Sequence, residues 1–441
     1  MQANVLVIGG DETVSQLSGV LSRLKVKVRG VSREEEIRQA LRASSPTVVF
    51  DGDFYAAQNG KTEKILGLLQ RSKKDFIVLS SRKEPSKILE FKQSGAADYI
   101  LKPYNTREFI MRFNAVRIKK IRIACLGGGT GLFMLLLGLK AIPHVLLTSI
   151  VSMSDDGGSS GKLSQQFGIL PPGDIRRSLV ALSNAPEVMN QIMQYRFDRG
   201  GELYGHSFGN IFLTVLSEVK GSMPEAVKAL SDILNIQGIV LPATRTLTSL
   251  VAQFENGKII RGESKIDVGY GRRAELRIKK LWHEPEPESD ADAFASILSA
   301  DFVIIGPGDL YTSVITNLAL KNIRLAVTRT KAKKIYVCNL MTKPGETTHF
   351  DALDHVKEII KYLGKDALDY VLISNSKLSD ESTWEYSKKN QFPVIVGHVK
   401  DIQKITHAAI LLADVGNQTE LVRHDSVKLR KEIEKIIEKE I

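Results

Sequence analysis

The chain has 441 residues, of which 43% are apolar and 25% are charged, and these proportions are those of a folded globular protein. They exclude a disordered or fibrous class, and the length predicts two or three units at roughly 100–200 residues per domain. The formal net charge is +11. Because the basic residues are spread along the chain, a phosphorylated small molecule is favoured over nucleic acid as the anionic partner.

Redox and targeting signals predict a cytoplasmic protein. Cys125 and Cys338 both lie within apolar, strand-like runs and are predicted to be buried. Two cysteines are too few for a disulfide framework, which fits a reducing compartment. The amino terminus has neither a basic start nor a long apolar core, so it does not predict a signal peptide. The apolar stretch that follows residue 131 is interrupted by Lys140, Pro143 and His144 before it reaches about 18 residues, so no membrane span is expected.

Residues 1–118 alternate short apolar runs with stretches of helical period, which predicts a first α/β unit. Repeats of this kind predict a parallel sheet wound on both faces, of the flavodoxin-like class. Groups that act in such sheets gather at the carboxyl ends of the strands. The predicted strands are NVLVIG, KVKVRGV, TVVFD, FIVLSS and DYILKP, and the predicted helices cover 13–23, 34–43, 61–71, 85–93 and 106–117.

The stretch GAADYILKP, Gly95 to Pro103, resembles the receiver domain of response regulators, and the resemblance covers the whole first unit. In that family an aspartate on the third strand accepts a phosphoryl group and an acidic pair after the first strand binds magnesium. A hydroxyl residue and a lysine complete the site. The resemblance assigns these roles to Asp51 as the phosphoacceptor, Ser80 as the hydroxyl residue and Lys102 as the lysine.

The acidic pair of this receiver-like unit is displaced. Gly9 and Gly10 occupy the positions of the pair, Asp11 and Glu12 follow them, and Asp53 competes for the acceptor position. Without two well-placed carboxylates a magnesium ion is poorly held, and phosphoryl transfer loses its charge neutraliser. The sequence therefore favours an unphosphorylated unit that keeps only the fold.

A second unit is predicted over residues 119–441, and it begins with the strand IRIACL. The strand leads directly into GGGTG, Gly127 to Gly131, and LFMLLLGLK then has the apolar period of a helix. A strand, a glycine turn and a helix start together form an anion site, because the first N–H groups are unpaired and missing Cβ atoms let a phosphate approach. A purely structural tight turn is the alternative.

Two carboxylates follow the next predicted strand, VLLTSIVSM. Asp155 and Asp156 lie in SDDGGSSGKL, beside another glycine loop. Their distance from the first loop is near the spacing of about 20 residues at which an acidic residue meets a ribose hydroxyl in dinucleotide-binding folds. The same carboxylates could instead hold a divalent cation that bridges a diphosphate. Both roles stay open.

Two further segments carry polar candidates. In GILPPGDIRRSLVAL, Asp174 is predicted to cap a helix whose first turn holds Arg176 and Arg177. Arginine in a first turn opposes the helix dipole unless it meets an anion, which favours a ligand contact. In YGHSFGNIFL, a hydrogen-bonding or structural role of His206, near Asn210, is favoured over that of a base, because no cysteine or suitably spaced second histidine accompanies it.

Residues 252–282 alternate in the manner of strands, with a turn at Asn256 and Gly257, and predict a β-hairpin inserted in the α/β unit. The strand DFVIIG then leads into GPGDLYTSVITNL, and the strand in KKIYVCNLMTKPGET ends at Asn339 before another glycine-containing loop. Three such loops from one sheet predict a common crevice.

The carboxyl-terminal stretch DSVKLRKEIEKIIEKEI has a helical apolar stripe formed by Leu429, Ile433, Ile436 and Ile437. The stripe predicts a helix that packs on the sheet, and the balanced charges predict a solvated opposite face.

GGGTGL, SDDGGSSGKL, GILPPGDIRRSLVAL, GHSFGN, GPGDLYTS and YVCNLMTKPGET occur in the order seen in the gluconeogenesis factor family, the YvcK-like proteins. Residues 121–430 resemble this family, which is related in fold to the CofD-type 2-phospho-lactate transferases of cofactor F420 synthesis. The resemblance implies a Rossmann-like, three-layer α/β domain that binds UDP-sugars such as UDP-N-acetylglucosamine. It also implies a role in cell shape and wall synthesis on gluconeogenic carbon sources, with no established catalytic activity.

The resemblance adds Tyr386 and Arg423, in the carboxyl-terminal part, as ligand contacts. Asp309 stands where the family usually has serine, and Thr316 where proline is expected. A carboxylate at position 309 would repel a diphosphate unless a cation or its orientation relieves the repulsion. The candidate ligand contacts are Gly127, Gly128, Gly129, Thr130, Gly131, Asp155, Asp156, Gly157, Asp174, Arg176, His206, Asn210, Gly306, Gly308, Asp309, Tyr311, Thr312, Asn339, Met341, Tyr386 and Arg423.

Binding is favoured over catalysis, because the sequence offers no convincing nucleophile, acid–base pair or metal cage, and no catalytic residue is predicted. The leading hypothesis is a regulatory protein that senses a UDP-sugar. The rival is a transferase in which Asp155, Asp156 and a magnesium ion position a diphosphate ester for attack by an alcohol. Hydride transfer with a nicotinamide cofactor is a third, weaker alternative. A regulatory protein partner and a homo-oligomer are left open.

Overall fold

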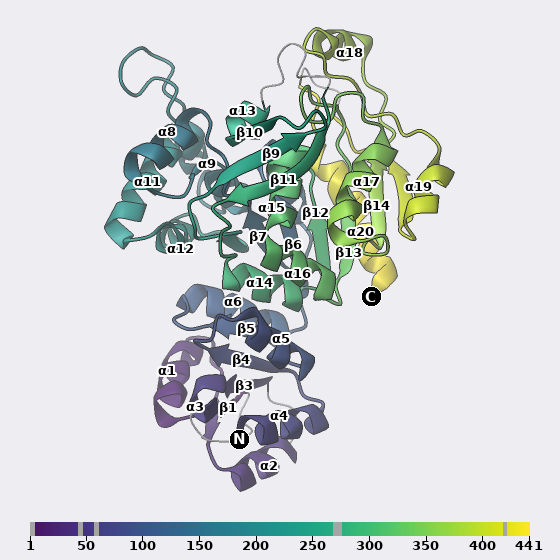
Figure 1. The fold of residues 1–441 in the computed structure, drawn as a ribbon. Helices are drawn as coiled ribbons and strands as arrows, with labels where there is room; N and C mark the ends of the chain where they lie inside the picture. Colours follow the sequence, from purple (N-terminus) through teal and green to yellow (C-terminus); the bar gives the residue numbers. More distant parts are fainter. Residues whose placement is uncertain (1–4, 43–46, 57–60, 268–275, 418–420) are drawn as a thin grey trace.

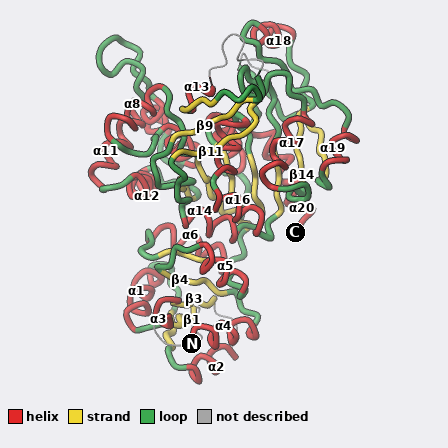
Figure 2. Tube along the Cα trace, in the orientation of Figure 1, coloured by secondary structure: helices red, strands yellow, loops and turns green. Residues whose placement is uncertain are grey.

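The computed structural model of the protein describes residues 5–42, 47–56, 61–267, 276–417 and 421–441. Within these ranges the strands form a five-stranded, a seven-stranded and a three-stranded sheet. The five-stranded sheet and its helices form one end of the molecule, and the seven-stranded sheet forms the larger part above it in the view of Figure 1. Figure 2 shows the strands of both parts enclosed by helices. No helix of the described residues is both long and apolar enough to cross a bilayer.

The first sheet is parallel, with the strand order β2-β1-β3-β4-β5. Flavodoxin-like folds share this order, whereas the assignment to the receiver class stays a prediction. Apart from β2, the strands are almost wholly buried, as their continuous apolar runs require. The elements are β1 (Val5–Ile8), α1 (Asp11–Ser22), β2 (Val28–Val31), α2 (Glu34–Arg42), β3 (Thr47–Asp51), α3 (Gly52–Ala56), α4 (Lys61–Ser72), β4 (Phe76–Ser80), α5 (Pro85–Gln93), β5 (Asp98–Leu101) and α6 (Thr106–Arg117).

The five predicted strand and helix repeats of the first unit are confirmed, with two differences. The strand β2 begins at Val28 rather than Lys25, because Lys25 has a positive φ of 54° and closes the turn that follows α1. The short helix α3 was not predicted, since its five residues show no helical period.

The second sheet is parallel, with the order β15-β14-β13-β12-β6-β7-β8. The chain enters at β6 in the middle, proceeds to the β8 edge, and returns to β12, which is the Rossmann-like winding. The elements are β6 (Ile121–Gly127), α7 (Gly129–Leu139), β7 (Val145–Val151), α8 (Gly158–Phe167), α9 (Gly173–Leu182), α10 (Glu187–Gln194), α11 (Phe208–Lys220), α12 (Met223–Ile233), β8 (Ile239–Pro242), α14 (Ala291–Ser299), β12 (Phe302–Ile305), the π-helix η2 (Leu310–Ile315), α15 (Thr316–Ala319), α16 (Lys321–Arg329), β13 (Lys333–Val337), α17 (Ala352–Leu363), β14 (Tyr370–Ser374), α18 (Asp380–Ser387), α19 (Val399–Ile405), β15 (Ala409–Ala413) and α20 (Ser426–Glu440).

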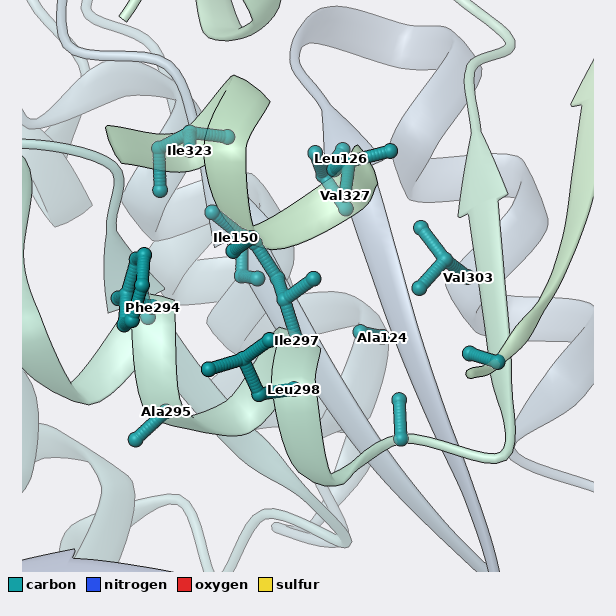
Figure 3. Close-up of a cluster of buried hydrophobic side chains, with 14 of the residues drawn as sticks. Ala124, Leu126, Ile150, Phe294, Ala295, Ile297, Leu298, Val303, Ile323 and Val327 are labelled. Atoms are coloured by element: carbon teal, nitrogen blue, oxygen red, sulfur yellow. The ribbon is translucent and has the colours of Figure 1, made fainter. Parts of the chain in front are cut away.

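Helices cover both faces of the seven-stranded sheet, so the predicted three-layer architecture is confirmed. On one face, apolar side chains of α14 and α16 pack against β6, β7 and β12, and Figure 3 shows Phe294 and Ile297 of α14 in this cluster. On the other face, α7, α9, α12 and α20 share a second cluster with the sheet. Burying each such side chain contributes roughly 1.5–3 kcal/mol, so the two clusters fix the sheet on which the site is built.

The inserted antiparallel segment is larger than predicted. It contains β9 (Ser249–Phe254), β10 (Ile259–Arg261), the helix α13 (Glu263–Asp267) and β11 (Ile278–Glu284). The predicted hairpin β9–β10 is present, but β9 also pairs with β11, so that the segment is a three-stranded sheet. A period of two residues predicts strands but does not tell how many of them pair.

The predicted apolar stripe of the last helix is confirmed. All four of its residues are buried in α20 and belong to the same cluster as Leu372 of the sheet. The helix also packs closely on α7, where a Cβ atom at Gly138 would lie 2.2 Å from the carbonyl oxygen of Ser426. The carboxyl terminus therefore covers the same helix that carries the first glycine loop.

The two parallel sheets are joined through a packed interface. The helix α14 packs on α5 and β5, and α6 packs on β7. Arg122, at the start of β6, donates a hydrogen bond of 2.6 Å to the carbonyl oxygen of Ala97, and Arg107 of α6 donates to the carbonyl oxygens of Ser231 and Ile236. Guanidinium groups thus bind main-chain carbonyls across the interface, and these hydrogen bonds hold the five-stranded and seven-stranded parts together.

Candidate functional site

The carboxyl ends of β6, β12 and β13 lie side by side in the seven-stranded sheet. β6 and β12 are neighbours, but the chain leaves β6 toward β7 and leaves β12 toward β13, so the winding reverses between them. Open α/β sheets bind ligands outside the carboxyl ends of the strands at such a reversal. Two of the predicted glycine loops, after β6 and β12, therefore flank the position where this type of sheet places its site.

The first glycine loop brings the start of a helix to this edge. β6 ends at Gly127 and α7 begins at Gly129, which has a φ of +66° that favours glycine. A Cβ atom at Gly131 would lie 2.5 Å from the carbonyl oxygen of Pro307, so the second loop crosses directly over the first turn of α7. The N–H groups of a first helical turn lack intrahelical partners and carry the positive end of the dipole. This geometry suits an anion.

Hydrogen bonds tie the three loops together. The N–H of Gly306 donates to the carbonyl oxygen of Leu126 at 2.9 Å. The Asn339 amide donates to the carbonyl oxygen of Gly308 at 2.7 Å, and the Asn317 amide donates to that of Gly127 at 3.4 Å. The common crevice expected from the sequence is thus formed by loops that hold one another in place.

A pocket of about 300 Å³ opens between these loops, and we call it the switch-point pocket. The predicted contacts that line it are Thr130, Gly131, Gly308, Asp309, Asn339, Met341, Tyr386 and Arg423. The lining residues that were not predicted are Met134, Leu340, Thr342, Lys343, Gln391, Val422 and His424. Three of these, residues 340, 342 and 343, lie within the YVCNLMTKPGET motif, whereas no local pattern marks the others.

The carboxyl-terminal wall of the pocket is held by polar contacts. The hydroxyl oxygen of Tyr386 accepts a hydrogen bond of 3.0 Å from the N–H of Val422, and His424 Nε2 lies 3.2 Å from the carbonyl oxygen of Cys338. Burial lowers the pKa of His424 to about 4, so this imidazole is neutral at physiological pH and Nε2 donates the bond. The wall is therefore anchored both to α18 and to the end of β13.

The helix start after the second glycine loop already holds a carboxylate of the protein. Glu346 Oε2 accepts hydrogen bonds from the N–H groups of Tyr311 and Thr312, at 3.0 and 3.3 Å, and Oε1 accepts from the Thr312 hydroxyl at 2.9 Å. Glu346 is almost completely buried. The main-chain N–H groups at 311 and 312 therefore have an anionic partner inside the protein, and neither residue lines the pocket.

A second group of carboxylates lies behind the first glycine loop. Asp174 Oδ2 is 2.5 Å from the position of a Cβ atom at Gly128, and Asp155 Oδ2 is 2.8 Å from that at Gly173. Burial and the neighbouring Asp174 raise the pKa of Asp155 to about 6. The prediction that Asp174 caps a helix is wrong. It lies within the first turn of α9, where it accepts a hydrogen bond of 2.8 Å from Arg177.

Asp155 and Asp156, which the sequence treated as equivalent, have different surroundings. Asp156 accepts hydrogen bonds from the N–H groups of Glu263 and Ser264, at 3.0 and 2.7 Å, and thereby holds the start of α13. Asp155 accepts from the N–H of Gly157 at 3.1 Å and faces Asp174. Of the two, only Asp155 belongs to the carboxylate group behind the loop.

Arg176, His206 and Asn210 form a polar network instead of lining the pocket, and Arg176 and Asn210 are buried in it. Arg176 Nε donates to Asn210 Oδ1 at 2.9 Å, and the Asn210 amide donates to the Ser159 hydroxyl at 3.3 Å. His206 Nδ1 lies 3.2 Å from the same hydroxyl. This geometry agrees with the hydrogen-bonding role favoured for His206. It gives the Arg176 guanidinium a partner within the protein, so the predicted ligand contact of Arg176 stays a prediction.

Comparison with known proteins decides the family. The family model of 2-phospho-L-lactate transferase CofD matches residues 123–414. A protein of Aquifex aeolicus named "Putative gluconeogenesis factor" is 40% identical over 331 residues, covering 74% of this chain and 99% of the relative. The gluconeogenesis factor of Bacillus subtilis is 39% identical over 312 residues, covering 70% of this chain and 96% of the relative. The chain belongs to the gluconeogenesis factor family.

A solved structure agrees with this assignment. The crystal structure of a UPF0052 family member from Bacillus halodurans has a TM-score of 0.67 and is 37% identical, covering 71% of this chain and 99% of that chain. The switch-point pocket lies within the span shared with the CofD model, apart from its carboxyl-terminal residues Val422, Arg423 and His424. The five-stranded sheet of this chain precedes the matched residues.

The strand-end carboxylates of the five-stranded sheet are bound by the protein. Asp51 is 3% exposed, and its oxygens accept hydrogen bonds from Lys102 Nζ at 2.7 Å and from the Thr13 hydroxyl. Burial alone would raise the pKa of Asp51, but Lys102 and Thr13 outweigh it and hold the pKa below its usual range. The Ser80 hydroxyl donates to Asp53 at 2.6 Å rather than to Asp51.

The two acidic residues that follow Gly9 and Gly10 lie on a helix. Asp11 and Glu12 are exposed in the first turn of α1. A side chain at Gly9 would collide with Asp51, because a Cβ atom there would lie 2.8 Å from Asp51 Cβ. Position 9 is therefore closed to a larger side chain in this arrangement, and the absence of phosphorylation stays a prediction.

Incubation of the full chain with acetyl phosphate and magnesium is expected to add no stoichiometric phosphate to Asp51. The reason is that both oxygens of Asp51 are bound within the protein, and that Asp11 and Glu12 lie in the exposed first turn of α1. Intact mass spectrometry measures the addition, with Asp51→Asn as the control. A full phosphate on the unmodified chain that is lost in Asp51→Asn would show that the unit accepts a phosphoryl group.

Proposed function

We propose that this member of the gluconeogenesis factor family is a cytoplasmic regulatory protein whose switch-point pocket binds a UDP-sugar of the UDP-N-acetylglucosamine type. In this proposal it supports cell shape and wall synthesis on gluconeogenic carbon sources. The single observation that carries the proposal is the juxtaposition, in one pocket, of the first turn of α7 with Tyr386 and Arg423. A helix start and a guanidinium suit a diphosphate, and an aromatic side chain suits a base or sugar ring.

Regulation rather than turnover is proposed for the pocket, because the described residues that line it include no nucleophile paired with a base. The imidazole of His424 is buried and neutral, and its Nε2 donates to a main-chain carbonyl. The chain belongs to a family whose named members are gluconeogenesis factors. These points support binding as the function of the site.

A transferase is the second candidate. The match to the 2-phospho-L-lactate transferase model favours it, as do the carboxylates of Asp155 and Asp174 behind the glycine loop. An aspartate with a pKa of about 6 could accept the proton of an attacking alcohol near neutral pH. Magnesium-dependent turnover of a nucleotide-linked substrate, abolished in Asp155→Asn, would establish this candidate.

UDP-N-acetylglucosamine is expected to raise the Tm of the full chain. A ligand at 100 times its Kd adds about 2.7 kcal/mol to the free energy of unfolding. Differential scanning fluorimetry with UDP-N-acetylglucosamine, UDP, N-acetylglucosamine and NAD measures the shift, with UDP giving part of it and NAD giving none. Arg423→Met should lose most of the shift. An unchanged Tm at millimolar UDP-N-acetylglucosamine, with and without magnesium, would count against the proposed function.

A further inference from the structure

Lys343 lies among three carboxylates that come from three separate segments. Asp267 ends α13, Asp309 follows β12, and Glu346 follows β13. Lys343 Nζ is 2.5 Å from Asp309 Oδ2 and 3.4 Å from Glu346 Oε1, and it contacts Asp267 Oδ1. One ammonium group therefore joins the inserted antiparallel segment to two loops of the seven-stranded sheet.

This cluster reaches the switch-point pocket. Lys343 and Asp309 both line the pocket, together with Thr130 and Gly131 from the first turn of α7. The side chain of Asp309 is 44% exposed, whereas that of Glu346 is fully buried. A diphosphate bound at the start of α7 would therefore share the pocket with the carboxylate of Asp309, which would repel it.

The three carboxylates resemble the ligand set of a cation. One oxygen from each of Asp267, Asp309 and Glu346 lies within 4.8 Å of the other two. Carboxylate oxygens at such spacing are what hard divalent cations bind. Here the positive charge among them is the ammonium of Lys343, which contacts all three.

The ammonium is held in its charged form. Burial alone would lower the pKa of Lys343, but Glu346, Asp309 and Asp267 outweigh burial and raise the pKa. The same charge opposes the rise that burial causes in the pKa of Glu346. Glu263, on the same helix as Asp267, has a pKa raised to about 9 by burial and by Asp267, so it is protonated at neutral pH and adds no charge.

We propose that Lys343 is the built-in counter-ion of the switch-point pocket, which stands in for a divalent cation and makes the binding of a diphosphate ligand independent of metal. This inference rests on the proposed function, because it concerns the metal dependence of ligand binding at the same site. Because Lys343 neutralises Asp309 from within the protein, the pocket can accept the diphosphate without a metal bridge. Lys343 is thus a specificity-determining residue that the family resemblance did not point to.

Isothermal titration of the full chain with UDP-N-acetylglucosamine, in EDTA and in excess magnesium, tests the proposal. For the unmodified protein the two Kd values are expected to agree within about twofold. For Lys343→Met the Kd in EDTA is expected to rise at least about tenfold, because Asp309 is left unpaired beside the diphosphate. Magnesium should restore most of that loss, since the three carboxylates are then free to bind it.

Two further variants keep the test decisive. Lys404→Met removes an exposed lysine of α19 whose ammonium contacts Asp401, and this variant should bind the ligand as the unmodified protein does. Asp309→Ser with Lys343→Met removes the carboxylate together with its counter-ion, so it should bind more tightly in EDTA than Lys343→Met alone. This double variant also gives a readout if Lys343→Met is too unstable to titrate.

The outcomes separate this inference from the proposed function. No binding by the unmodified protein in either buffer would remove the proposed function. Binding by the unmodified protein only in magnesium would leave that function intact and overturn the role of Lys343. Unchanged binding of Lys343→Met in EDTA would overturn it as well, whereas a loss that magnesium reverses would establish it, because a purely structural role would not respond to a cation.

Discussion

Gly131→Val is expected to lose at least roughly 100-fold in affinity for UDP-N-acetylglucosamine, or about 2.7 kcal/mol. The Cβ atom would lie 2.5 Å from the carbonyl oxygen of Pro307 and 2.8 Å from the main-chain nitrogen of Gly308. Because these are main-chain atoms, the side chain cannot be accommodated by a rotamer change, and the two glycine loops must separate. Isothermal titration measures the affinity, and the Tm of the free variant reports the cost of overpacking, which is typically 1–3 kcal/mol.

The control for this variant is Gly200→Val. A Cβ atom at Gly200 meets nothing within 4 Å, and Gly200 is exposed. Its affinity should be that of the unmodified protein. If Gly131→Val bound the nucleotide-sugar as tightly as Gly200→Val, the contact between the two glycine loops would have no part in binding, and the site would have to be placed elsewhere.

Arg112→Met is expected to destabilise the five-stranded unit by about 3–5 kcal/mol, because it leaves a buried carboxylate without its partner. Arg112 and Asp98 are each about 2% exposed, and their side chains form two hydrogen bonds, of 2.9 and 2.6 Å. Burial alone would raise the pKa of Asp98, but Arg112 outweighs it and holds the pKa at about 2. Native-state amide exchange in peptides from β5 and α6 reports the stability of this unit separately.

Arg38→Met is the matched control, since Arg38 forms an exposed pair with Glu34 in the same unit. Such a surface pair contributes little to stability, because solvent screens both charges. Replacing both buried partners, as in Asp98→Leu with Arg112→Met, should recover most of the loss, because the carboxylate that loses its guanidinium partner is then removed as well. Equal exchange rates in Arg112→Met and Arg38→Met would contradict the assigned importance of the buried pair.

The sequence predicted the secondary structure correctly where it depends on neighbouring residues. The run from Ile121 to Gly131 predicts a strand, a turn and a helix start, because β-branched residues, glycine and a leucine period each act locally. The same holds for the five repeats of the first unit and for the stripe of α20. The sequence also predicted that the glycine loops meet, because the carboxyl ends of parallel strands share one edge of a sheet.

Side-chain partners distant in sequence could not be predicted. The motif containing Tyr311 and Thr312 suggested a second anion site, but its N–H groups bind Glu346, which follows 34 residues after Thr312. Asp156 matched a ligand-binding pattern, yet it holds the start of α13, in a segment whose third strand was itself missed. In both cases a carboxylate and its donors are brought together by the packing of separate elements, which no local spacing encodes.

The sequence by itself determined the two α/β units, the glycine-rich helix start and the family. Only the tertiary structure decided which of the candidate side chains surround the pocket and which are bound within the protein. It also decided that the carboxylate of Asp309 is neutralised by Lys343, which lies 34 residues further along the chain. The physical reason is that backbone propensities depend on adjacent residues, whereas the pairing of buried charges depends on where whole strands and loops pack against one another.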